Sequence, residues 1–149
     1  MIPRMGEIRA DGRKYTLRPG AYAVLPRGGS VLVTHEGGSD ENLQLPGGGI
    51  DPGESVLAAL HREVMEETGW RIASPRRVGT YRRFAYMPEY DLWAEKICHI
   101  YLARPVRRVG LPTEPHHTAL WVSADHADLV LGAEGNRHFM RRALAGEFK

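Results

Sequence analysis

The segment His61–Gly69, which reads HREVMEETG, constrains this chain more than any other part of it. An α-helix turns by about 100° per residue, so Glu63 and Glu67 would lie about 40° apart, with Glu66 about 60° from Glu63. Like charges at this spacing destabilise a helix, and carboxylates in its last turn also oppose the helix dipole. Arg62 can pair with Glu66, but one cation does not neutralise three anions. The missing positive charge is most simply a divalent cation that prefers oxygen ligands.

The neighbouring sequence distinguishes this interpretation from that of a solvated acidic patch. Leu57, Leu60 and Val64 follow the helical period, which predicts a helix over residues 54–68 that ends at Gly69. Upstream lies PGGG at residues 46–49, where helix is disfavoured and where the backbone can approach a ligand closely. A carboxylate-rich helix beside a glycine-rich turn is suited to Mg²⁺ and a polyphosphate.

The rest of the chain alternates between predicted strands and helices. The extended pattern, with turn residues between segments, predicts strands over 22–26, 30–35, 77–86, 94–104 and 120–122, with a shorter extended piece over 43–45. Helices are predicted over 125–131 and 136–145. This order favours an α/β fold in which helices pack on a mixed sheet, and 149 residues fit a single domain over 1–149.

Composition excludes several other classes of protein. Hydrophobic residues make up 42% and charged residues 26%, which is typical of a globular domain. The single cysteine, Cys98, rules out an internal disulfide framework and a cysteine-based zinc site. The net charge of +2 and the scattered arginine pairs are not the pattern of a dedicated nucleic-acid-binding module. The chain has neither the apolar segment of a signal peptide nor a run of about 18 apolar residues, so we expect a cytoplasmic protein without a membrane span.

From Gly48 to Trp70 the sequence resembles the Nudix box of MutT-like hydrolases. That box reads G-x5-E-x7-R-E-U-x-E-E-x-G-U, where U is a bulky apolar residue. Every fixed position is filled here, and Val64 and Trp70 occupy the two U positions. The resemblance implies a Nudix-type α/β/α sandwich with a mixed β-sheet.

The resemblance also implies a metal site. Glu63 and Glu67 would be the main metal ligands, Glu66 would assist directly or through water, and the backbone carbonyl of Gly47 or Gly48 would add a ligand. The implied cofactor is Mg²⁺, with Mn²⁺ as a substitute. These carboxylates would be the catalytic residues of the box.

Other positions of the box would be structural. Glu54 and Arg62 would tie the loop to the helix through a carboxylate–guanidinium contact, and Gly48 and Gly69 would complete the structural positions. Outside the box, the general base would be Glu114 first, or His116 or His117 second.

Substrate contacts are less well defined by the sequence. His35 stands where many members carry a phosphate-binding arginine, which Arg27 or the Arg82-Arg83 pair could replace. The candidates for substrate contact are Arg27, His35, Arg82, Tyr86 and His116.

Three functions follow from the resemblance. The first is hydrolysis of a nucleoside diphosphate linked to a group X, giving a nucleoside monophosphate and phosphorylated X. The second is removal of oxidised or non-standard nucleoside triphosphates from the nucleotide pool. The third is a non-catalytic sensor that binds a nucleotide or RNA end, against which the intact set of carboxylates argues. The expected partner is a nucleotide-type small molecule, and the formation of a homodimer is left open.

Overall fold

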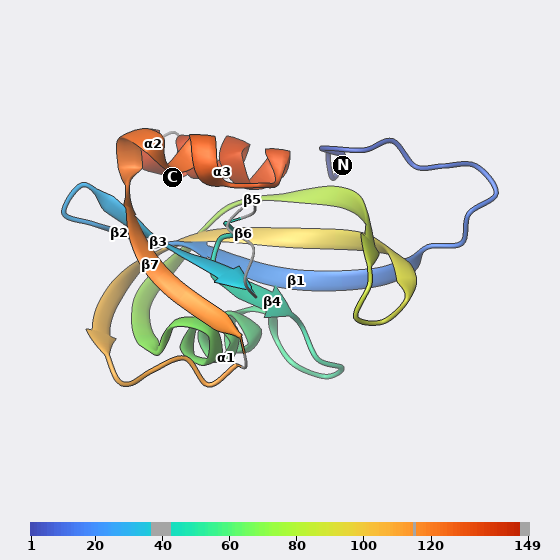
Figure 1. The fold of residues 1–149 in the computed structure, drawn as a ribbon. Coiled ribbons are helices and arrows are strands. Elements are labelled where there is room, and N and C mark those ends of the chain that lie inside the picture. Colours follow the sequence, from blue (N-terminus) through green and yellow to red (C-terminus); the bar gives the residue numbers. More distant parts are fainter. Residues whose placement is uncertain (37–42, 115, 147–149) are drawn as a thin grey trace.

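The computed structural model describes residues 1–36, 43–114 and 116–146 (Figure 1). In chain order, its elements are β1 (Thr16–Val24), β2 (Pro26–Arg27), β3 (Ser30–Glu36), β4 (Gly47–Gly49), α1 (Val56–Thr68), β5 (Trp70–Met87), β6 (Leu92–Arg108), β7 (His117–Ser123), α2 (Ala124–Val130) and α3 (Glu134–Ala145).

Two β-sheets form the centre of the molecule. The larger sheet has the strand order β4-β1-β6-β5, in which β1 and β6 are parallel and the other pairs are antiparallel. The smaller sheet, β2-β3-β7, is antiparallel throughout. Figure 1 shows α1 on one side of the sheets and α2 with α3 on the other. The predicted α/β/α sandwich with a mixed β-sheet is confirmed.

Helix α1 is defined by its two caps and one apolar side. The Ser55 hydroxyl accepts a hydrogen bond from the Ala58 amide at 3.1 Å, which satisfies one of the free N–H groups of the first turn. Leu60 and Val64 are fully buried against the larger sheet, as their spacing predicts. Leu57 was expected on the same side but is 44% exposed, because Val56 contributes the apolar contact from the first turn.

Several strands are longer than the sequence predicts. Strand β1 begins at Thr16, since Pro19 and Gly20 do not interrupt its pairing with β6. Strands β5 and β6 form one long hairpin whose register shifts near Ser74, which has a positive φ of 54°. Such irregularities hide the alternation of apolar and polar residues by which strands are predicted. Pro115, which stands between the candidate residues Glu114 and His116 in the sequence, lies outside the described residues.

The N-terminal segment covers the free edge of β5. The Arg82 amide donates to the Pro3 carbonyl at 2.8 Å, and the Met5 amide donates to the Arg82 carbonyl at 2.9 Å. Backbone groups at a sheet edge are otherwise open to pairing with another chain. Within the described part of the chain, no helix is both long enough and apolar enough to cross a lipid bilayer.

Gly69, which ends α1, gives a test of the fold. Its φ is 75°, its amide caps the helix by donating to Met65, and an added Cβ would stand 2.0 Å from the Gly110 carbonyl oxygen. Left-handed backbone costs a non-glycine residue roughly 1–2 kcal/mol, and the contact with Gly110 adds to that cost. We expect Gly69→Ala to lower the free energy of unfolding by more than the roughly 1–2 kcal/mol of the backbone cost alone, as measured by urea denaturation.

Gly146 is the matched control for this substitution. It ends α3 with a similar φ of 72°, but an added Cβ would meet nothing within 4 Å. Gly146→Ala should therefore show the conformational cost alone. Equal destabilisation by the two substitutions would contradict the role of the close approach at Gly69.

Candidate active site

Three carboxylates from two separate segments meet beside the end of α1. Glu63 and Glu66 lie on the helix and Glu114 on the loop before β7, and one carboxylate oxygen from each lies within 4.8 Å of the others. The Glu66 carbonyl holds this loop, since it accepts from the amides of Thr113 and Glu114 at 2.8 and 3.0 Å. All three glutamates are half-buried. Such a set of oxygen donors fits a hard divalent cation such as Mg²⁺.

Glu67 lies deeper than the other glutamates and joins three elements. It is 9% exposed; its Oε1 accepts from the Gly47 amide at 3.0 Å, and its Oε2 lies 3.2 Å from His117 Nε2. Burial raises the pKa of this carboxyl, while hydrogen bonds from His117 and Gly47 act in the opposite direction. Glu67 thus connects α1 to β4 and β7, and its pKa shows that burial outweighs these two contacts.

Arg62 binds the loop that precedes the helix. Its Nε and Nη2 donate to the two oxygens of Glu54 at 2.7 and 2.8 Å, and Nη2 also donates to the Gly49 carbonyl at 3.0 Å. Its Nη1 donates to Glu63 at 2.9 Å and to Glu66 at 3.3 Å. The Arg62 hydrogen bonds lower the pKa of the Glu54 carboxyl to about 2, with a smaller contribution from the Asp51 amide. One guanidinium therefore fixes both the loop and the two carboxylates.

Gly48 allows β4 to lie directly against this carboxylate cluster. A Cβ at Gly48 would stand 2.4 Å from Oε2 of Glu63, closer than any side chain permits. The glycine-rich turn is an extended strand paired with β1, with Gly48 opposite Ala21. The predicted backbone ligands, Gly47 and Gly48, thus lie beside the glutamates, and coordination by their carbonyls remains a prediction.

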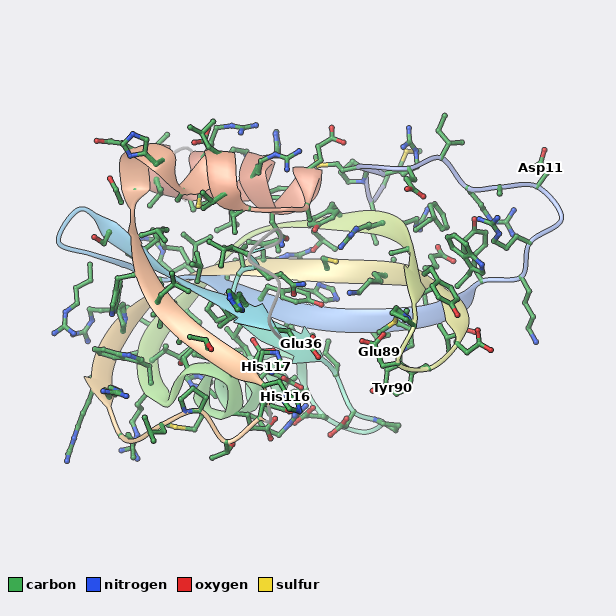
Figure 2. The ribbon with its side chains drawn as sticks, viewed as in Figure 1. Asp11, Glu36, Glu89, Tyr90, His116 and His117 are labelled. Atoms are coloured by element: carbon green, nitrogen blue, oxygen red, sulfur yellow. The ribbon has the colours of Figure 1, made fainter. Side chains whose placement is uncertain are left out.

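The two adjacent histidines differ in position. His117 begins β7 opposite Glu36 of β3 and contacts Glu67, whereas His116 is exposed in the loop with a φ of 65° (Figure 2). The sequence could not separate them, because the choice depends on where β7 begins. His117 is the histidine that reaches the cluster of α1, and His116 remains a predicted substrate contact.

The predicted arginine contacts already have partners elsewhere. The exposed Arg27 places its guanidinium carbon 5.1 Å from the ring centroid of Trp70. Arg82 pairs with Glu95 of β6 at 2.9 Å. These contacts orient both arginines, and a role for either in binding substrate remains a prediction.

Two further candidates lie on strands. His35 of β3 is half-buried opposite Thr118 of β7, one position from the pair formed by Glu36 and His117. The Tyr86 hydroxyl donates to the Asp91 carboxylate at the tip of the β5–β6 hairpin. Both remain predicted substrate contacts, since their positions alone do not show what they bind.

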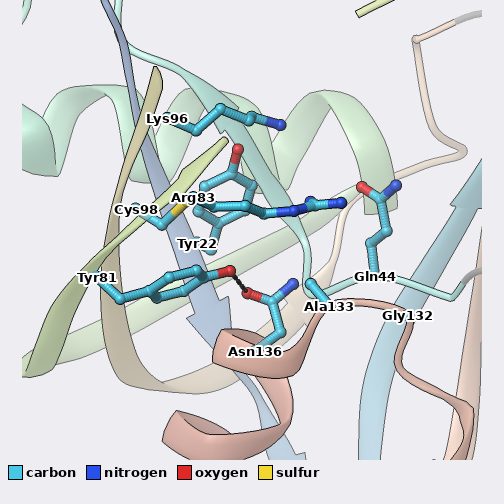
Figure 3. Close-up of a pocket in the computed structure, with 9 residues that line it drawn as sticks. All are labelled: Tyr22, Gln44, Tyr81, Arg83, Lys96, Cys98, Gly132, Ala133 and Asn136. Carbon is cyan, nitrogen blue, oxygen red and sulfur yellow. Dashed lines mark hydrogen bonds between the residues drawn. The ribbon is translucent and has the colours of Figure 1, made fainter. Parts of the chain in front are cut away.

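A polar cavity that the sequence did not reveal lies on the α3 side of the larger sheet (Figure 3). Its polar and charged side chains come from five separate segments, which is why no local motif marks them. They are Tyr22, Gln44, Tyr81, Arg83, Lys96 and Asn136. The only sequence signal was the Arg82-Arg83 pair, of which Arg83 is the member that lines the cavity.

The pKa of Glu63 gives a test of the cluster. Burial raises the pKa of this carboxyl from its ordinary 4.5 to about 7, against the hydrogen bond from Arg62. The folded state then binds a proton more tightly than the unfolded state, so stability decreases as pH rises from 4.5 to 7. Relative to Glu63→Gln, we expect the metal-free wild-type protein to lose stability from pH 5 to pH 8, measured by urea denaturation with a chelator.

Added Mg²⁺ should restore that stability at pH 8, because the cation replaces the proton. Glu7→Gln, a substitution at an exposed position, serves as the control. Parallel stability profiles for wild type and Glu63→Gln would contradict the raised pKa.

Comparison with known proteins finds relatives whose names state two different activities. A putative 8-oxo-dGTP diphosphatase from Bacillus subtilis (strain 168) is 45% identical over 49 residues, which are 33% of this chain and 33% of that protein. A CMP-5'-(N-acetyl-N-hydroxy-3-aminopropyl)phosphonate hydrolase from Streptomyces rubellomurinus is 36% identical over 90 residues, 59% of this chain and 41% of that protein. The matches span less than half the length of either relative.

The fold has counterparts among solved structures, and one family model matches most of the chain. A NUDIX hydrolase from Nitrosomonas europaea superposes with a TM-score of 0.72 at 21% identity, covering 89% of this chain and 92% of that one. At this level of identity the similarity concerns the fold. The model of the NUDIX domain matches residues 15–143, which include both sheets and the carboxylate cluster. The chain therefore belongs to the NUDIX family.

Proposed function

We propose that the chain is a Mg²⁺-dependent pyrophosphohydrolase that cleaves a nucleoside diphosphate linked to a group X. The products would be a nucleoside monophosphate and phosphorylated X. The observation that carries this proposal is the cluster of Glu63, Glu66 and Glu114, whose carboxylate oxygens lie within 4.8 Å of one another. Water can cleave the phosphoric anhydride without a covalent nucleophile on the protein.

Glu63 and Glu66 would hold the cation next to Glu114, with Glu67 and the carbonyls of β4 as further predicted ligands. Mg²⁺, or Mn²⁺ in its place, would neutralise charge on the pyrophosphate oxygens and acidify a bound water. The chain itself supplies the rigid support for these ligands. Arg62 orients Glu63 and Glu66 through hydrogen bonds of 2.9 and 3.3 Å, so the carboxylates need little rearrangement when the cation binds.

Two groups can take the proton of the attacking water. Glu114 is attached to the loop before β7 and lies within the cluster, so it can accept a proton there. Glu67 has a pKa raised by burial and contacts His117, to which a proton could pass. We favour Glu114, because its carboxylate is half-buried and therefore accessible to a water molecule, whereas the carboxylate of Glu67 is buried.

A second candidate function is removal of oxidised nucleoside triphosphates. The relative from Bacillus subtilis, named a putative 8-oxo-dGTP diphosphatase, favours it. The relative from Streptomyces rubellomurinus, named a hydrolase of a CMP-linked phosphonate, favours the first function, because its substrate carries a group X. Both proposals use the same cluster and the same bond cleavage.

A substrate panel separates these functions. The purified protein with Mg²⁺ is incubated with nucleoside triphosphates including oxidised ones, nucleotide sugars, dinucleoside polyphosphates and dinucleotide cofactors, and the products are separated by chromatography. We expect release of a nucleoside monophosphate, which requires cleavage of a pyrophosphate bond. Tight nucleotide binding by calorimetry without turnover would overturn the proposal in favour of a sensor.

Glu67→Gln tests the site directly. The substitution keeps the shape of the side chain and an oxygen to accept from the Gly47 amide, but it removes the negative charge. We expect kcat to decrease by about 10²-fold or more, as is typical when a charged catalytic group is removed. We also expect the melting temperature to rise, because a buried carboxylate whose pKa is raised destabilises the folded state at pH 8.

Asp11→Asn is the matched control, since it removes one carboxylate charge from an exposed position of the N-terminal segment (Figure 2). Both kcat and the melting temperature should stay at the wild-type values in this variant. Full activity of Glu67→Gln would remove Glu67 from the catalytic machinery.

A further inference from the structure

Three positively charged side chains stand next to one another across the larger sheet. Lys96 of β6 lies opposite Arg18 of β1 and also opposite Arg83 of β5. Residues directly opposite on neighbouring strands project from the same face of a sheet. Lys96 and Arg83 both line the polar cavity, and all three side chains are half-buried.

Such a row is unfavourable unless a negative charge joins it. Like charges directly opposite on adjacent strands destabilise a sheet. The acidic neighbour in sequence, Glu95, points to the other face and pairs with Arg82. Across residues 1–36, 43–114 and 116–146, neither Lys96 nor Arg83 forms an ion pair with a carboxylate.

The pKa of Lys96 agrees with this arrangement. Burial is the largest cause that lowers the pKa of Lys96, and Arg83 and Arg18 lower this pKa further, whereas Cys98 and Glu89 raise it. The lowered pKa means that the surroundings disfavour the charged form of this side chain. Arg18 places its guanidinium carbon 4.5 Å from the centroid of the Tyr90 ring, but no described carboxylate pairs with Lys96 or Arg83. A local rule broken in this way suggests that a ligand supplies the missing charge.

The other groups in the cavity are suited to a ligand rich in hydrogen-bond acceptors. The Asn136 carbonyl oxygen accepts from the Tyr81 hydroxyl at 2.8 Å, which leaves the Asn136 amide nitrogen as a donor. Figure 3 shows the polar ends of Arg83, Lys96 and Gln44 extending to the same side of the cavity. Two cations and several donors facing one space match a phosphate or carboxylate group.

The cavity lies next to the carboxylate cluster. Tyr22, which lines the cavity, connects the two regions. Its hydroxyl oxygen and the Gly48 carbonyl oxygen both lie close to Gly20, since a Cβ added at Gly20 would stand 2.9 Å from the first and 3.0 Å from the second. Gly48 in turn lies against the carboxylate of Glu63. One molecule can therefore place its pyrophosphate at the cluster and a second group in the cavity.

We propose that Lys96 and Arg83, flanked by Arg18, form a subsite for a second anionic group of the substrate, outside the pyrophosphate that is cleaved. The substrate class is then a nucleoside diphosphate derivative that carries an additional phosphate or carboxylate. This inference rests on the proposed function for its placement in a reaction, but binding at the subsite needs no catalysis.

Matched substrate pairs identify the source of the anion. Coenzyme A against its dephospho form, and NADPH against NADH, test a phosphate on the nucleoside side. UDP-glucuronate against UDP-glucose tests a carboxylate on group X, and ATP against ADP tests a terminal phosphate. We expect wild type to prefer the charged member of one pair by about 10–100-fold in kcat/KM, the range of one charge-assisted hydrogen bond.

Arg83→Gln and Lys96→Gln should remove that preference mainly through KM. Lys96→Arg, which keeps the charge, should retain most of it. Arg71→Gln is the control, because it makes the same substitution at an exposed position of β5. A preference that survives Arg83→Gln and Lys96→Gln together would overturn the inference.

A binding measurement without metal separates this inference from the proposed function. With a chelator present, inorganic tripolyphosphate should raise the melting temperature of wild type, Arg71→Gln and Glu67→Gln, but not of the variant with both Arg83→Gln and Lys96→Gln. The double variant should itself melt no lower than wild type, because it removes like charges that face each other. If no substrate is hydrolysed but this pattern holds, the proposed function fails and the subsite stands. Equal stabilisation of the double variant and wild type would overturn the subsite even if hydrolysis is found.

Discussion

The guanidinium of Arg62 holds together the parts of the acidic site. It forms two hydrogen bonds with Glu54 from the loop before α1, a third with the Gly49 carbonyl of β4, and further contacts with Glu63 and Glu66. A planar fork with several donors can make all these contacts at once, whereas an ammonium group cannot. Without this charge, the glutamates of α1 would repel one another, and, among the described residues, β4 would be held to the helix only through the hydrogen bond from the Gly47 amide to Glu67.

Strand β4 separates two regions of opposite charge. Glu63 lies against Gly48 of this strand, and Tyr22, which lines the cavity together with Arg83 and Lys96, lies opposite Gly47. Only glycine allows the backbone to lie this close to Glu63, since any Cβ at Gly48 would overlap its carboxylate. A short strand of glycines thus brings the two regions within reach of one ligand.

Much of the fold was predictable where the signal is local. The period of Leu60 and Val64, together with Gly69, predicted α1 to within two residues at its start and correctly at its end. The starts of β1 and β5 were predicted too late, because Pro19 and the irregularity near Ser74 interrupt the alternation without ending the strands. Pairing with a neighbouring strand overrides such local signals, and that pairing is not visible in one sequence.

The candidate site, like the fold, has one part that the sequence predicts and another part that only the tertiary structure reveals. Three glutamates within five residues and a glycine run upstream are enough, in sequence alone, to predict a cluster that binds a divalent cation. The approach of Glu114, the choice of His117 over His116 as the contact of Glu67, and the row of Arg18, Lys96 and Arg83 were decided only by the tertiary structure. The physical reason is the range of the contacts. Helix geometry fixes the spacing of residues three or four apart, whereas strand register and loop closure bring together side chains that are far apart in the chain.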